Sequence, residues 1–150
     1  MDARAQLDSF IDKFAPEVAA DARYALAFLS ARFPTATQIV YDNYNALAIG
    51  FGSGDKASDA VLSIAVYPKY ATLFLLNGVN LPDPEGLLEG SGSRVRHIKL
   101  RPVSKIETPE VNALIDTVVA AAEPPLPADG KGQLIIKSVS PKQRPRRPGG

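Results

Sequence analysis

The sequence predicts an α+β fold of two layers, in which an antiparallel sheet of about five strands is covered on one face by two N-terminal helices and one C-terminal helix. Three observations lead to this prediction. Apolar residues recur at helical spacing near the N-terminus, short β-branched and aromatic runs separated by turn formers follow from residue 38, and a second helical stripe appears after residue 108. We therefore expect helices at both ends and strands between them.

The first two helices are predicted from apolar stripes separated by a proline. Leu7, Phe10, Ile11 and Phe14 lie on one face of a helix, which Pro16 should end. Proline is well tolerated at the first helical position, so a second helix should begin at Pro16 and run to about residue 32. Its buried face is expected to hold Val18, Ala22, Ala25, Leu29 and Phe33.

The middle of the chain is typical of antiparallel strands. We expect strands over residues 38–42, 46–51, 60–67, 72–76 and 95–100. Residues 52–55 are typical of a hairpin loop, and a single helical turn is expected at Leu87 and Leu88. Thr108 is a suitable N-cap for the last helix, with Pro109 at its first position. The buried stripe of that helix should be Val111, Leu114, Ile115, Val118 and Val119.

The composition of the chain divides it into a domain over residues 1–122 and a proline-rich, basic, largely flexible tail over residues 123–150. The first part holds 11 Lys and Arg against 14 Asp and Glu, net −3, and the tail holds 6 against 2, net +4. Residues 134–136, Leu-Ile-Ile, are too hydrophobic for full exposure and are a candidate edge strand. Residues 142–150 are expected to be disordered.

Composition also excludes several classes of chemistry. The 150 residues include no cysteine, which rules out a disulfide framework, a thiolate metal site and a thiol nucleophile. No stretch approaches the roughly 18 to 20 apolar residues of a membrane span, and the N-terminus lacks the apolar core of a signal peptide. We therefore expect a cytoplasmic protein without a membrane partner.

The most distinctive local stretch joins two glycines to three groups that can carry positive charge. Gly90 and Gly92 precede Arg94, Arg96 and His97, and a glycine turn with charge-assisted donors can cradle a phosphate or carboxylate. The stretch matches neither the P-loop nor the dinucleotide fingerprint. Its alternative interpretation is a structural turn that enters a strand. His97 is the only histidine and no nucleophile is identifiable beside it, so we name no catalytic residue.

Aromatic residues gather in the strand region, and one face of the sheet is expected to be partly open. Tyr44 and Tyr67 are candidate ligand-binding residues on that face. Core packing is the alternative for these rings. The basic tail offers a second route to a partner, because Arg144, Arg146 and Arg147 could contact a nucleic acid through counterion release.

Two acidic groups are candidates for metal ligands. Asp8 and Asp12 lie one helical turn apart, and Asp83, Glu85 and Glu89 lie within seven residues, so either group could offer oxygen atoms to a hard cation. Solvated surface carboxylates are the alternative interpretation of both groups.

Residues 74–100, which contain Leu-Pro-Asp-Pro, Gly-Ser-Gly and Arg-His, resemble the signature of the YdhG-like family, largely a domain of unknown function. Residues 41–46 and 64–68 resemble its upstream strands, and the similarity covers roughly residues 8–122. The resemblance implies a frataxin-like α/β sandwich, and it implies iron as a cofactor because some relatives are described as intracellular iron chaperones. This chain departs from that pattern: it has Ser93 where relatives often carry lysine, and it lacks a dense acidic ridge.

These observations lead to a functional expectation with an alternative from another class. We expect a non-enzymatic intracellular binding or chaperone-like domain, with iron delivery as its sharper form. The alternative is a protein or enzyme that binds an anionic small molecule through Gly90 to His97.

Overall fold

The computed structural model describes residues 2–148, and this part of the chain forms three α-helices and one sheet of six strands. The helices are α1 (Ala3–Ile11), α2 (Pro16–Arg32) and α3 (Pro109–Ala120). The strands are β1 (Thr37–Asp42), β2 (Leu47–Gly52), β3 (Ala60–Val66), β4 (Ala71–Leu75), β5 (Arg96–Lys99) and β6 (Leu134–Val139). Short 3₁₀ turns, η1 (Ala57–Asp59) and η2 (Val103–Glu107), precede β3 and α3. The predicted α+β class is confirmed.

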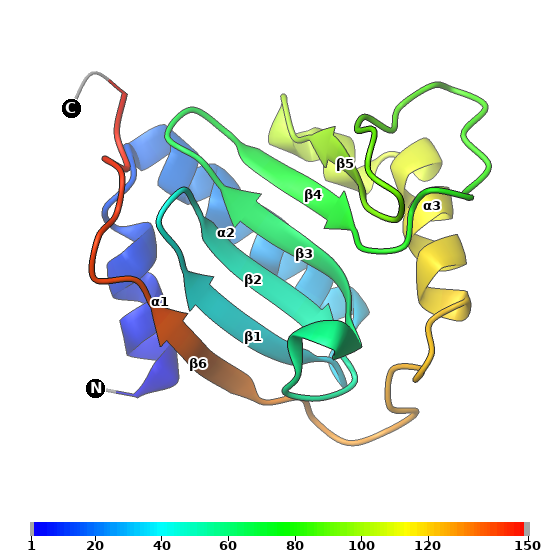
Figure 1. Ribbon diagram of the computed structural model, residues 1–150, viewed down its shortest axis with the longest axis horizontal. Helices are drawn as coiled ribbons and strands as arrows, with labels where there is room; N and C mark the ends of the chain where they lie inside the picture. Colours follow the sequence, from blue (N-terminus) through cyan, green and yellow to red (C-terminus); the bar gives the residue numbers. More distant parts are fainter. Residues whose placement is uncertain (1, 149–150) are drawn as a thin grey trace.

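The sheet differs from the prediction in strand count and in direction. Its strands lie in the order β5-β4-β3-β2-β1-β6, and neighbours from β5 to β1 are antiparallel, whereas β6 runs parallel to β1. The sheet therefore has six strands and is mixed. After α3 the chain passes the end of the sheet that is lower in the view and reaches the opposite edge. There β6 lies beside β1 and runs in the same direction (Figure 1). The apolar run 134–136 supplies the strand that the sequence left as a candidate.

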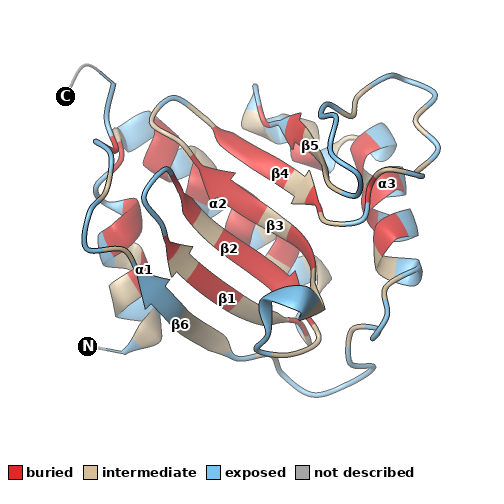
Figure 2. Cartoon of the chain, viewed as in Figure 1, coloured by how far each residue is buried: buried red, intermediate tan, exposed pale blue. Residues whose placement is uncertain are grey.

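The helices pack against one face of the sheet, and the hydrophobic core lies between them (Figures 1 and 2). The core side chains of neighbouring strands stand opposite one another in the sheet register and are at most 1% exposed: Val40, Ile49, Ile64, Leu73 and Ile98. Alternate residues of the same strands point to the other face. No α-helix in residues 2–148 lies over that face, which we call the open face (Figure 1).

Local sequence signals explain where the helices begin. The Asp2 carboxylate accepts a hydrogen bond from the Ala5 backbone N–H at 2.8 Å and caps α1. Pro16 occupies the first turn of α2, and the Thr108 hydroxyl accepts from the Val111 N–H at 3.4 Å at the start of α3. The predicted Thr108 cap is therefore confirmed. Among residues 2–148, no helix is long and apolar enough to cross a membrane.

Residues 87 and 88 form no helical turn, so that prediction is wrong. The two oxygens of the Asp83 carboxylate accept hydrogen bonds from the backbone N–H groups of Leu87 and Leu88, each at 2.9 Å. A side chain that takes both N–H groups replaces the helical hydrogen bonds with a local loop. Asp83, which stands between two prolines in the sequence, thus acts in turn formation.

Much of the chain after residue 122 is docked on the domain rather than disordered. Residues 134–139 form β6, and the Arg146 side chain is buried at the end of the sheet. The prediction of disorder over residues 142–150 is therefore wrong for Arg146, because a buried carboxylate holds its guanidinium. Gly149 and Gly150 lie outside the described residues.

At Gly132 the chain passes close to the backbone of Ala36, the residue before β1. A Cβ atom at this position would lie 1.8 Å from the Ala36 carbonyl oxygen, and the Gly132 N–H donates to the Pro34 oxygen at 2.9 Å. We expect Gly132→Ala to lower the free energy of unfolding by about 1–3 kcal/mol, because the backbone must move to relieve the overlap. Urea denaturation measures this effect, with the exposed Lys131→Ala as the matched control. Equal stabilities for the two variants would contradict the observed approach.

Candidate ligand-binding site

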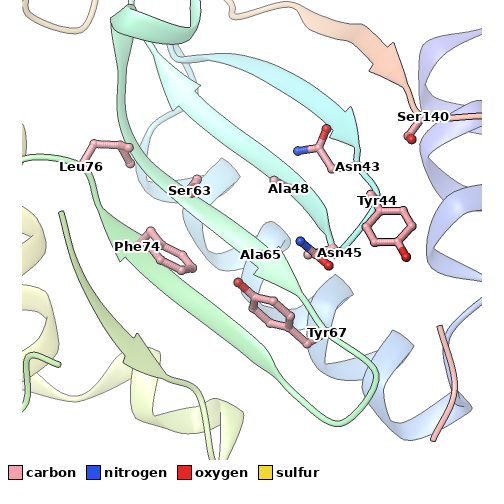
Figure 3. Close-up of a pocket in the computed structure, with 11 residues that line it drawn as sticks. Asn43, Tyr44, Asn45, Ala48, Ser63, Ala65, Tyr67, Phe74, Leu76 and Ser140 are labelled. Carbon is pink, nitrogen blue, oxygen red and sulfur yellow. The ribbon is translucent and has the colours of Figure 1, made fainter. Parts of the chain in front are cut away.

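The open face holds a cavity of about 640 Å³ near the β1–β2 hairpin. Eleven described residues line it, and Figure 3 shows how most of them lie. They are Asn43, Tyr44, Asn45, Ala46, Ala48, Ser63, Ala65, Tyr67, Phe74, Leu76 and Ser140. This volume is typical of sites for small organic molecules, which are commonly between about 300 and 1,000 Å³.

Small side chains on two neighbouring strands form the floor of the cavity. Ala48 of β2 stands directly opposite Ala65 of β3, and Gly50 stands opposite Ser63. Because side chains alternate between the two faces of a strand, these small residues lie on the open face while Ile49 and Ile64 enter the core. The floor is therefore low, and a flat group could approach the backbone of the sheet closely.

Aromatic rings stand around this floor. The rings of Tyr44 and Phe74 lie on opposite sides of the strands that carry Ala48 and Ala65, and Tyr67 follows at the end of β3 (Figure 3). Burial raises the pKa of the Tyr67 phenol, and the neighbouring Tyr70 raises it further. Tyr67 consequently stays protonated at neutral pH, where its O–H is available as a hydrogen-bond donor.

A second cavity of about 750 Å³ adjoins the first and differs from it in charge. The two cavities share Asn45 and Tyr67. Lys69 from the β3–β4 turn and two residues of the C-terminal segment, Arg144 and Arg147, supply positive charge to the second. All three of these side chains are exposed. By contrast, no acid, lysine, arginine or histidine is among the eleven described residues that line the first cavity.

The structure does not bring the predicted anion-binding residues to one site. Arg96 folds back on its own turn, where Nη1 donates to the carbonyl oxygens of Gly92 at 2.5 Å and Val95 at 2.8 Å. Arg94 lines a different, smaller cavity near the end of α3. Gly90 has a φ of +119°, so this glycine serves a tight turn that enters β5.

His97 lies at the margin of the open face rather than in an anion cradle. Its backbone pairs with Glu89 through two hydrogen bonds, N–H to O in each direction, at 3.0 and 2.9 Å. The imidazole packs against the Phe74 ring with the ring centres 5.3 Å apart. Of the seven candidate ligand residues, Tyr44 and Tyr67 line one cavity together, and His97 contacts its wall.

The acidic candidates occupy separate places. Asp12 pairs with Arg23 at 2.7 Å, and the Asp8 carbonyl oxygen accepts from the same guanidinium. Glu85 lines a small apolar pocket beside α3 with Asp83, whereas Glu89 pairs through its backbone with His97. Within residues 2–148, no group of three or more His, Asp or Glu side chains is arranged to hold a metal ion.

No protein-family model, curated protein or solved structure matches this chain. The resemblance to the YdhG-like family therefore stays a prediction, together with the frataxin-like fold and the iron chemistry that it implies. The candidate site rests on the geometry of the open face alone.

The sequence predicted the two tyrosines, Tyr44 and Tyr67, but neither the floor of small residues nor the second, basic cavity. Small residues alternate with large apolar ones through residues 46–51 and 60–67, and that alternation was the available signal for a low sheet face. The position of Arg144 beside Tyr44 had no local signal, because the two residues are 100 positions apart in the chain.

Proposed function

We propose that this protein is a non-enzymatic binding domain whose open sheet face takes a small organic ligand with a flat, largely apolar body. The observation that carries the proposal is the cavity of about 640 Å³, with its floor of Ala48, Ser63 and Ala65 and its aromatic walls. Aromatic groups pack well on such rings by offset or edge-to-face contacts. The cytoplasmic location expected from the sequence belongs to the same proposal.

A few polar groups would orient the ligand. The carboxamides of Asn43 and Asn45 each offer two donors and an acceptor, and the Tyr67 hydroxyl adds a neutral donor. Small-molecule sites commonly combine an apolar lining with a few such groups. The lining supplies neither a nucleophile–base pair nor a carboxylate for acid–base chemistry, which favours binding over turnover among the described residues.

The test is a fluorescence titration with N-phenyl-1-naphthylamine, a neutral flat probe that becomes fluorescent in apolar surroundings. Saturable binding by the intact chain is expected. Ala48→Phe should weaken it at least tenfold, because the new ring occupies the space above the floor. Ala27→Phe is the matched control, since Ala27 is exposed on α2.

Thermal melting of both variants checks that the fold is retained, so that weaker binding reports the site. Binding that is equal in Ala48→Phe and the intact chain would show that the probe does not use the open face. An absence of saturable binding by the intact chain would likewise overturn the proposal.

A further inference from the structure

We infer that the ligand of the open face carries an anionic group, such as a phosphate or carboxylate, and that Lys69, Arg144 and Arg147 bind this group. The inference rests on the proposed function and names the chemical class of the ligand. Its basis is that the two cavities are neighbours and share Asn45 and Tyr67 in their linings. A ligand with its flat body in the first cavity would extend its other end among these cations.

No ion pair among the described residues neutralises the three cations. None of the four ion pairs found within residues 2–148 includes Lys69, Arg144 or Arg147. Arg147 Nε donates to the Lys13 carbonyl oxygen at 3.1 Å, and this acceptor carries no charge. Arginine donors form strong, often two-pronged hydrogen bonds with carboxylate and phosphate oxygens.

The C-terminal segment is held so that two of its arginines reach this cavity. The Arg144 backbone N–H donates to the Tyr44 carbonyl oxygen at 2.9 Å, and its guanidinium carbon lies 5.7 Å from the centre of the Tyr44 ring. Tyr44 in turn lines the first cavity. Arg144 therefore stands where the apolar and the basic cavities meet.

Arg146, between the two exposed arginines, is the positioning residue. Its Nη2 donates to Asp42 Oδ1 at 2.9 Å and to the Asn43 carbonyl oxygen at 2.6 Å. The guanidinium also lies over the Phe14 ring, 5.6 Å from its centre. One buried arginine thus anchors the segment to β1 and to the loop before α2, and its neighbours are placed at the cavity.

The inference is tested with two probes that share one flat body. 1-Anilinonaphthalene-8-sulfonate carries a sulfonate, which represents the anionic group, and N-phenyl-1-naphthylamine lacks it. We expect the intact chain to bind the sulfonate probe at least tenfold more tightly at low salt, and this preference should shrink at higher ionic strength. Inorganic pyrophosphate should compete with the sulfonate probe but not with the neutral one.

The double variant Arg144→Gln/Arg147→Gln should lose the preference for the sulfonate, so that it binds the sulfonate probe no more tightly than the neutral one. The control is Lys131→Gln/Lys137→Gln, which removes the same charge from exposed positions in and before β6. If the neutral probe binds at Ala48 but both double variants keep the intact chain's preference for the sulfonate probe, the inference is overturned while the proposed function stands. If neither probe binds the intact chain, the proposed function fails. If pyrophosphate also fails to bind, the anion site is overturned independently of the proposed function.

Discussion

Replacing Ile64 with alanine is expected to lower the free energy of unfolding by about 2–5 kcal/mol, because the change removes three carbon atoms from the centre of the core. Ile64 is fully buried on β3, and its register partners are Ile49 on β2 and Leu73 on β4. Its side chain faces the helices, so the cavity left behind would be surrounded by packed residues. Urea or guanidinium denaturation gives the value directly.

The neighbouring residue supplies a sharp control for that measurement. Ser63 lies on the same strand but on the open face, where it is partly exposed. Ser63→Ala should change the stability by no more than about 0.5 kcal/mol, as surface substitutions usually do. Similar losses for the two variants would contradict the placement of the core on one side of the sheet.

Truncation of Arg146 to alanine is expected to cost about 3 kcal/mol, because it leaves the carboxylate of Asp42 buried without its main partner. Asp42 is fully buried, and Arg146 is only 6% exposed. The remaining cation near the carboxylate is Lys13, whose Nζ lies 3.5 Å from Oδ2 and whose side chain is about half exposed. Chemical denaturation measures the loss of stability.

The same variant should release the C-terminal segment. The backbone N–H groups of Ser140 and Arg144 donate to the carbonyl oxygens of Asp42 and Tyr44, at 2.8 and 2.9 Å. In Arg146→Ala these amides should exchange with deuterium faster than they do in the intact chain, with the amides of β2 as the reference region. Hydrogen exchange with mass spectrometry resolves the two regions. Unchanged exchange over residues 140–144 would show that the segment is held without Arg146.

A double replacement separates the contribution of the ion pair to stability from the cost of burying its two charges. Asp42→Leu/Arg146→Leu should be more stable than Arg146→Ala, since a buried ion pair can often be exchanged for apolar residues at little cost. Arg146 Nε and Nη1 have no hydrogen-bond partner among the described residues, so not all hydrogen-bond donors of this buried pair are satisfied. A double variant less stable than Arg146→Ala would mean that the ion pair itself contributes strongly.

The same arginine explains why part of the molecule could not be predicted from the sequence. Residues 140–148 carry the composition of a flexible basic tail, and local propensity offers no reason for order there. Order comes from long-range contacts, among them the ion pair of Arg146 with Asp42, which lies 104 positions earlier in the chain. The β1 pattern did not indicate a partner for this carboxylate, since a single aspartate at the end of a strand is equally typical of a turn.

Local pattern was sufficient for the helices and for most of the strands. Helical spacing of apolar residues, the prolines at residues 16 and 109 and the Thr108 cap each act within a few residues, so they can be recognised without the fold. The same holds for the alternation that separates a core face from an open face. In contrast, the place of β6 beside β1, its parallel direction and the meeting of Tyr44, Tyr67 and Arg144 depend on tertiary structure. These features join residues far apart in the chain, and such contacts form only when the free energy of the whole packed arrangement favours them.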